Sequence, residues 1–146
     1  MKLYLDVCCL NRPFDDQAQT RIHIESESII AILSYIQNNK WDLILSDIIE
    51  YEVSNLLDIN KREKVKIIFE LCGQKLKLNS EVEKRAHQLQ IKGVDILDSL
   101  HLAVAEFGKV DFFLTTDDKL LKKLKNISIN VKVLNPVNFL MEVINK

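Results

Sequence analysis

The sequence predicts an α/β protein in which a parallel sheet lies between two layers of helices. Short apolar runs alternate along the chain with longer segments that have helical periodicity. A strand, a helix and a second strand in succession are typical of a parallel sheet that is covered on both faces. The 146 residues are enough for one domain with a sizeable core, and no repeat or linker divides them. We therefore expect residues 1–146 to form a single three-layer α/β/α sandwich.

The first half of the chain is predicted to contain two buried strands, each a run of large apolar residues, at 3–5 and 43–45. Pro13 indicates a loop before the first long helix. Ser46 or Asp47 is placed to cap the helix that follows the second strand. The other predicted elements are a loop at 11–16 and helices at about 21–38, 46–57 and 62–71.

The second half begins with an alternating segment at 75–78 that predicts an edge strand. Ser80 and Glu83 fit a capping box, in which each side chain satisfies a free backbone N–H of the other residue. Asp95 is placed to cap an apolar helix that ends at Gly108. The other predicted elements are helices from 80 to about 93, from 117 to 124 and from 136 to about 144, and strands at 112–114 and 131–134.

The composition is that of an ordinary soluble protein, with 47% hydrophobic and 28% charged residues. No apolar run reaches the length of a membrane span, and the charge of Asp6 comes too early for a secretory signal. We therefore expect a cytoplasmic protein. Cys8, Cys9 and Cys72 are odd in number and lack zinc-ligand spacing, so they are expected to be reduced thiols that serve in packing.

The net charge of −1 conceals an uneven distribution. Residues 1–60 carry four Lys and Arg against ten Asp and Glu, whereas residues 61–146 carry sixteen against eleven. Basic side chains concentrate at 61–77 and at 119–125. Such patches can follow a phosphate backbone, but solvated helix faces have the same composition. The charge pattern alone therefore does not establish a nucleic-acid ligand.

Three acidic residues stand out because of where the predicted elements place them. Asp6 follows the first strand, at the carboxyl edge where parallel sheets bind ligands. Glu52 lies within the apolar stripe of its helix, whereas Glu50 lies on the polar face. Asp98 lies one turn inside a helix that is apolar nearly all round. Because buried carboxylates need a cation or hydrogen-bond donors beside them, Glu52 and Asp98 are predicted to serve a site.

A fourth acid comes from the pair Asp117 and Asp118, which follows the strand at 112–114. One of the two is expected to cap the next helix, and the other is expected to face the carboxyl edge of the sheet. Asp95 shares a helix face with Asp98, so these two carboxylates should repel each other unless a partner lies between them.

Carboxylates that converge at one edge of a parallel sheet are hard oxygen ligands suited to Mg²⁺ or Mn²⁺. Such ions activate a water molecule and stabilise the charge of a phosphodiester during its displacement. The chain has no P-loop, dinucleotide fingerprint or nucleophile elbow. The three histidines lack metal-ligand spacing with one another, and His101 is expected to be a core residue with satisfied hydrogen bonds. The acids therefore predict a divalent metal centre that acts on phosphodiesters.

Four segments of the chain match one protein family in their order and spacing. They are Leu5-Asp6, Ser46-Asp47-Ile48-Ile49-Glu50-Tyr51-Glu52, Asp98-Ser99-Leu100-His101-Leu102-Ala103 and Leu114-Thr115-Thr116-Asp117. In these segments the chain resembles the PIN-domain family, and especially the ribonuclease toxins of bacterial VapBC-type toxin–antitoxin pairs. The resemblance covers almost the whole chain.

The resemblance implies an α/β/α sandwich that binds Mg²⁺ or Mn²⁺ and cuts RNA. It places the catalytic, metal-binding acids at Asp6, Glu52, Asp98 and Asp117, and it gives Thr115 the role of a supporting hydroxyl. It also implies a homodimer and a small antitoxin partner whose tail reaches the acidic cleft. Apolar faces at 29–36 and 62–71 are the candidate contact surfaces.

The chain departs from the family pattern directly after the first acid. Where the family usually has Thr or Ser and then a small polar residue, this chain has Val7 and Cys8. The change removes a hydroxyl that would orient the metal's water ligands. The segment from 10 to 14 resembles one subgroup of PIN proteins, and Asn11 or Arg12 is a candidate to fill the gap. Asp95 is a further candidate supporting residue.

Two other functions compete with the nuclease. A non-catalytic PIN-like module that binds RNA or protein would keep the fold without turnover, although all four acids are intact. A phosphatase or receiver domain would phosphorylate an Asp after the first strand. That chemistry needs a second acid close to Asp6, and Val7 and Cys8 do not supply one.

Overall fold

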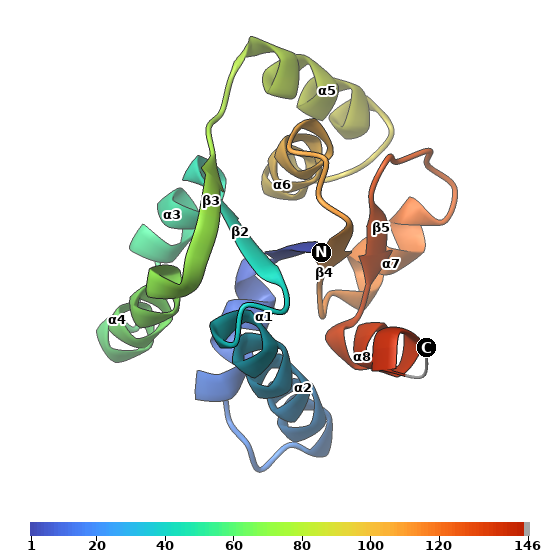
Figure 1. The fold of residues 1–146 in the computed structure, drawn as a ribbon. Helices are drawn as coiled ribbons and strands as arrows, with labels where there is room; N and C mark the ends of the chain where they lie inside the picture. The colour runs from blue at the N-terminus through green and yellow to red at the C-terminus, as the bar shows by residue number, and fades with distance from the viewer. Residues whose placement is uncertain (145–146) are drawn as a thin grey trace.

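The computed structural model describes residues 1–144 and contains one sheet of five parallel strands, in the order β3-β2-β1-β4-β5 (Figure 1). Leu3 of the central strand pairs with Leu43 on one side and with Phe112 on the other. The α/β class predicted from the sequence is therefore confirmed. The strands are β1 (Lys2–Leu5), β2 (Asp42–Ser46), β3 (Cys72–Leu76), β4 (Phe112–Leu114) and β5 (Lys132–Leu134).

Helices connect successive strands and cover both faces of the sheet. Figure 1 shows α1 and α2 on one side of the sheet and α5 and α6 on the other. The helices within residues 1–144 are α1 (Val7–Asn11), α2 (Thr20–Gln37), α3 (Asp47–Ser54), α4 (Ile59–Ile68), α5 (Ser80–Ile91), α6 (Ile96–Phe107), α7 (Asp118–Leu124) and α8 (Pro136–Ile144). Short 3-10 turns lie at Arg12–Phe14 and Phe69–Leu71.

The strand order reverses direction beside β1. The chain adds β2 and then β3 on one side of β1, and afterwards returns to place β4 and β5 on the other side. Because crossovers between parallel strands are right-handed, this reversal sends the connecting helices to opposite faces of the sheet. The carboxyl ends of β1 and β4 then lie at the point where the strand order reverses, which is where the ligand-binding crevice of open α/β sheets lies.

The three central strands are apolar without alternation, because helices cover both faces of the sheet. Leu3, Tyr4 and Leu5 of β1 have no exposed surface, and Phe113 and Leu114 of β4 have none either. The Tyr4 ring stacks on that of Phe113, with centroids 5.2 Å apart. Within residues 1–144, none of the helices combines the length and the hydropathy needed to span a bilayer.

Four local features differ from the sequence predictions, the first of which is α4, at Ile59–Ile68 rather than 62–71. The short helix α1 was not expected, because its five residues are too few to establish a helical period. The edge strand is β3, at Cys72–Leu76 rather than 75–78. The cap of α5 is Asn79, whose side chain accepts a hydrogen bond from Val82 N, so the capping box at Ser80 does not form.

Candidate metal centre

Asp6 lies where β1 ends and α1 begins, and its carboxylate is held in place from two sides. One oxygen, Oδ1, accepts a hydrogen bond from Val7 N at 2.8 Å and so caps α1. The other oxygen, Oδ2, accepts one from Thr115 Oγ1 at 2.9 Å. The side chain is buried, and burial raises the pKa of this carboxyl. A fixed, buried carboxylate thus stands at the crevice beside β1 and β4.

The hydroxyl of Thr115 links the acids that follow these two strands. Besides donating to Asp6, Thr115 Oγ1 accepts a hydrogen bond from Asp117 N at 3.1 Å. The geometry agrees with the supporting role that the resemblance gives to this hydroxyl.

Asp117 both caps α7 and belongs to the cluster, which corrects the expected division of roles between the two adjacent acids. Asp117 Oδ1 accepts hydrogen bonds from Lys119 N and Leu120 N, while the charge of its carboxylate acts on Asp98. Asp118 instead forms a two-pronged ion pair with Arg21, at 2.6 and 2.8 Å. One carboxylate can do both tasks because the cap engages only one of its oxygens.

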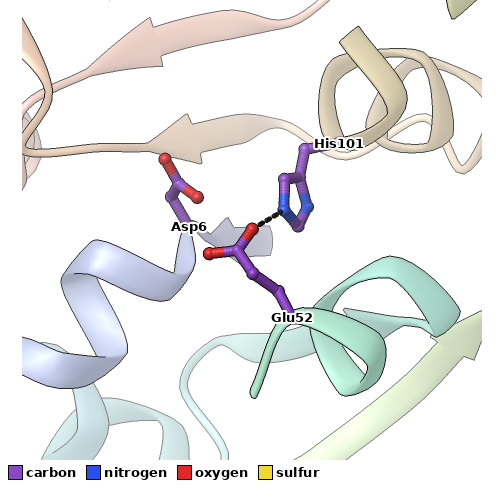
Figure 2. A group of neighbouring side chains, drawn as sticks. All are labelled: Asp6, Glu52 and His101. Atoms are coloured by element: carbon purple, nitrogen blue, oxygen red, sulfur yellow. Dashed lines mark hydrogen bonds and ion pairs between the residues drawn. The ribbon is translucent and has the colours of Figure 1, made fainter. Parts of the chain in front are cut away.

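Glu52 projects from α3 toward a buried histidine. His101 Nε2 lies 2.9 Å from Glu52 Oε1, and the histidine has no exposed surface (Figure 2). One ligand atom from each of Asp6, Glu52 and His101 lies within 4.8 Å of the other two. The inward-facing Glu52 therefore has the hydrogen-bond donor that its position requires. Its neighbour Glu50 turns away and forms an ion pair with Lys75 at 2.9 Å.

Asp98 lies in the first turn of α6 and is half-buried, less covered than its apolar sequence context predicts. The reason is that Ile96 and Leu97 face solvent. Burial raises the pKa of Asp98 to about 6, and the charges of Asp6 and Asp117 contribute to that rise. No group within residues 1–144 donates a hydrogen bond to this carboxylate, and no Lys or Arg there pairs with it.

Two of the candidate supporting residues are occupied elsewhere. Asp95 stands at the cap position of α6, but its side chain makes no capping hydrogen bond and instead lies 3.5 Å from Lys123. Arg12 binds Asp15 at 2.8 Å and Glu25 at 2.9 Å, so its guanidinium does not take the place of the missing hydroxyl.

Asn11 ends α1, and the atom Oδ1 of its side chain is buried without a hydrogen-bond partner in the described part of the chain. No hydrogen bond joins the side chains of Asn11 and Asp6 there.

Cys8, rather than Asn11 or Arg12, fills the gap left beside Asp6 by the missing hydroxyl. Its Sγ lies 3.5 Å from Asp6 Oδ2 and 3.5 Å from Thr115 Oγ1, and it accepts a hydrogen bond from Thr116 N at 3.4 Å. The thiol is thus a contact of the acidic site, which corrects its assignment to packing. All three cysteines are free thiols, as expected.

The donors present fit a hard divalent cation. Asp6 and Glu52 offer ligand atoms within 4.8 Å of each other, the charges of Asp6 and Asp117 act on Asp98, and within residues 1–144 none of these three aspartates forms an ion pair with a lysine or arginine. The charges of Asp6 and Asp117 add to the rise in the pKa of Asp98 that burial causes, whereas at Asp6 the raising effect of Glu52 on the pKa is smaller than the lowering effects of His101 and Thr115. A bound Mg²⁺ or Mn²⁺ would remove this repulsion, and carboxylate oxygens are the ligands that both ions prefer.

His101 is the residue whose place in the site the sequence reasoning missed. It was correctly expected to be a core histidine with satisfied hydrogen bonds, but one of those bonds goes to Glu52. The spacing of three residues from Asp98 along one helix was the available signal, because residues i and i+3 share a helix face.

Comparison with solved structures finds the same fold in a chain from the crystal structure of VapBC2 from Rickettsia felis bound to a DNA fragment from their promoter. The match covers 92% of this chain and 98% of the other, with a TM-score of 0.58 and 16% sequence identity. The likeness is one of fold. No protein-family description matches the sequence, and no curated protein is significantly similar to it.

Proposed function

We propose that this protein is a metal-dependent endoribonuclease that hydrolyses RNA phosphodiester bonds with Mg²⁺ or Mn²⁺. The observation that supports this most directly is that Asp6 and Glu52 lie within 4.8 Å of each other at the crevice beside β1 and β4, where Asp6 and Asp117 also act electrostatically on Asp98 and, in residues 1–144, no lysine or arginine pairs with these three aspartates. Such a cluster is costly to the folded protein unless a cation compensates it. The similarity of fold to a chain of a VapBC complex is in keeping with the proposal.

In the proposed site, Asp6, Glu52, Asp98 and Asp117 hold the metal. The bound ion would supply an activated water and stabilise the negative charge on the phosphate. Asp6 needs no reorganisation to bind, because Val7 N and Thr115 Oγ1 already fix its two oxygens. Asp117 keeps one oxygen in the cap of α7, which leaves the second oxygen for the ion.

Cleavage of RNA in Mg²⁺ or Mn²⁺ and in EDTA tests the proposal. Wild type should cut only with metal. Glu52→Gln removes a proposed metal ligand, so the cleavage rate should fall by more than about 100-fold, which is the upper end of the cost of losing a mere outer-shell partner. The matched control is Glu50→Gln on the same helix, which should cut normally because Glu50 pairs with Lys75 outside the cluster. RNA that is bound but never cut would point instead to the non-catalytic RNA-binding module.

We further propose that the chain is the toxin of a type II toxin–antitoxin pair, that it is a cytoplasmic homodimer, and that residues 1–146 form one PIN-like domain. Residues 145–146 lie outside the described part of the chain. Within the contact surfaces expected from the sequence, Ile29, Ile32 and Val65 are buried in the core, whereas Ile30 and Ile67 are exposed.

A different apolar surface is open to a partner. A groove of about 430 Å³ between α3 and α6 is lined by residues that include Tyr51, Leu78 and Ile96. Sedimentation of the chain, alone and together with the product of a short reading frame directly upstream, measures both parts of the partner proposal. A monomer that binds no such product would contradict them.

A further inference from the structure

A chain of three buried side chains runs from the middle of the sheet to the carboxylate of Glu52. Tyr4 OH lies 2.7 Å from Ser46 Oγ and 2.6 Å from His101 Nδ1. The opposite nitrogen of the same ring, Nε2, lies 2.9 Å from Glu52 Oε1. The Ser46 hydroxyl, in turn, accepts a hydrogen bond from Ile49 N and so caps the helix that carries Glu52.

Only one direction of donation along this chain gives every hydrogen an acceptor. Ser46 donates to Tyr4, Tyr4 donates to His101 Nδ1, and His101 Nε2–H donates to Glu52. In the opposite direction the Ser46 hydrogen would have no acceptor, since residues 1–144 offer this hydroxyl no third partner. Because Ser46 is fully buried, such an unsatisfied donor would be costly. The hydrogen bonds therefore place a hydrogen on Nε2 of His101.

We propose that His101 is a positioning residue for the metal centre, whose Nε2–H holds one oxygen of Glu52 so that the other oxygen faces Asp6 and the metal. The inference rests on the proposed function. It gives His101 a different role from its neighbours Asp6 and Glu52, because His101 orients a metal ligand and does not bind the ion itself. A nitrogen that donates its hydrogen to Glu52 has no lone pair left for an ion. Figure 2 shows the second oxygen of Glu52 on the side toward Asp6.

The packing around His101 suits it to this role. Tyr4 stacks on Phe113 and meets the His101 ring edge-to-face, with centroids 5.7 Å apart. Glu52 has a flexible side chain that is 29% exposed, whereas His101 is wholly buried. A rigid donor therefore fixes a mobile carboxylate, as is usual for side chains that orient metal ligands from the outer shell.

Mn²⁺ affinity of EDTA-stripped protein, measured by calorimetric titration, tests the role without relying on catalysis. His101→Leu should weaken binding by about 10- to 100-fold, as the loss of an outer-shell partner does. His101→Gln should stay within about threefold of wild type, because its amide N–H can reach the place of Nε2 and donate to Glu52. Melting of each metal-free variant verifies that it is folded, and His87→Gln on the exposed face of α5 is the matched control.

Tyr4→Phe removes the group that donates to Nδ1 while keeping the ring that stacks on Phe113. Nε2–H keeps Glu52 as its acceptor, whereas a hydrogen on Nδ1 would have none, so the tautomer should hold and Mn²⁺ affinity should fall by less than about tenfold, the low end of outer-shell effects. Tyr35→Phe, at a half-exposed position, is the matched control. Nitrogen NMR of the metal-free protein reads the tautomer directly: hydrogen on Nε2 in wild type and also in Tyr4→Phe.

Three results would overturn the proposal. The first is a wild-type ring whose hydrogen is found on Nδ1 alone, whatever the protein's activity. The second is an equal loss of Mn²⁺ affinity in His101→Gln and His101→Leu, which would make His101 a direct ligand, since an amide nitrogen does not bind metal. The third is unchanged affinity in His101→Leu. Absence of Mn²⁺ binding by wild type would contradict the proposed function itself and, with it, the positioning role.

Discussion

Asp98 is the least compensated carboxylate of the candidate centre. It accepts no hydrogen bond from residues 1–144, and its pKa is raised to about 6 by burial and by the charges of Asp6 and Asp117. A structural acid in the same place would need a buried partner, and breaking such a pair costs roughly 3–5 kcal/mol. Residues 1–144 provide no such partner. The charge of Asp98 thus opposes folding of the metal-free protein.

Asp98→Asn should therefore stabilise the metal-free protein while it abolishes cleavage. The rise in pKa of about two units corresponds to an upper bound of about 3 kcal/mol, which solvent screening of this partly exposed group reduces to about 1 kcal/mol. That change raises the melting temperature by about 2–4 °C for a chain of this size. Calorimetry in EDTA and an RNA cleavage assay measure the two effects. A variant that melts far below wild type yet still cuts RNA contradicts the assignment.

At the scale of single residues, the sequence predicted candidate acids for the site but not how they are held there. Burial patterns identified Glu52 and Asp98, and the strand ends identified Asp6. The link from Thr115 to Asp6 spans 109 residues, and that between His101 and Glu52 spans 49. Such contacts depend on strand order and helix docking, which no local pattern specifies.

The secondary-structure elements were predicted best where burial and periodicity agree. β1, β2, β4 and α6 lie within a residue or two of their expected bounds, because each combines an apolar run with a clear break. The cap of α5 was misassigned because Asn79 and Ser80 are adjacent and both are good capping residues. The extended backbone of Asn79, with φ −146°, decides in its favour.

Alanine substitutions at these two positions test which residue caps α5. Asn79→Ala removes the acceptor of Val82 N and should destabilise the protein by about 1 kcal/mol. Ser80→Ala, at the first residue of the helix, should change stability by less than about 0.5 kcal/mol, as surface substitutions usually do. Urea unfolding of both variants gives the comparison, and a larger loss in Ser80→Ala would restore the predicted capping box.

Over the whole molecule, ion pairs join basic side chains to acids from distant parts of the sequence. Much of the basic stretch at 61–77 is engaged within the fold: Lys61 binds Asp15 at 2.6 Å and Lys75 binds Glu50 at 2.9 Å. The sequence predicted a parallel sheet, yet not the order that places β4 beside β1. That order alone brings Asp6 and Asp117 to one crevice, so the centre is a property of the complete fold.

The last prediction concerns the stability of the whole protein as a function of pH, with and without metal. The folded pKa of Asp98, about 6, lies above its ordinary value of 3.8. The folded metal-free protein therefore binds this proton more tightly than the unfolded chain, and it loses stability as pH rises from about 4 to about 6. Asp6 acts in the same direction, since its pKa is also raised.

Bound Mn²⁺ should reverse this trend. The ion needs ionised carboxylates, so its stabilisation is small below about pH 4 and is complete above about pH 6. At a concentration 100 times its Kd, the ion should add about 2.7 kcal/mol at pH 7. Melting curves in Mn²⁺ and in EDTA should thus diverge as pH rises through this range, and in Asp98→Asn they should stay close together. Parallel curves for wild type at every pH would mean that no divalent ion binds among these acids, and that their repulsion is relieved in some other way.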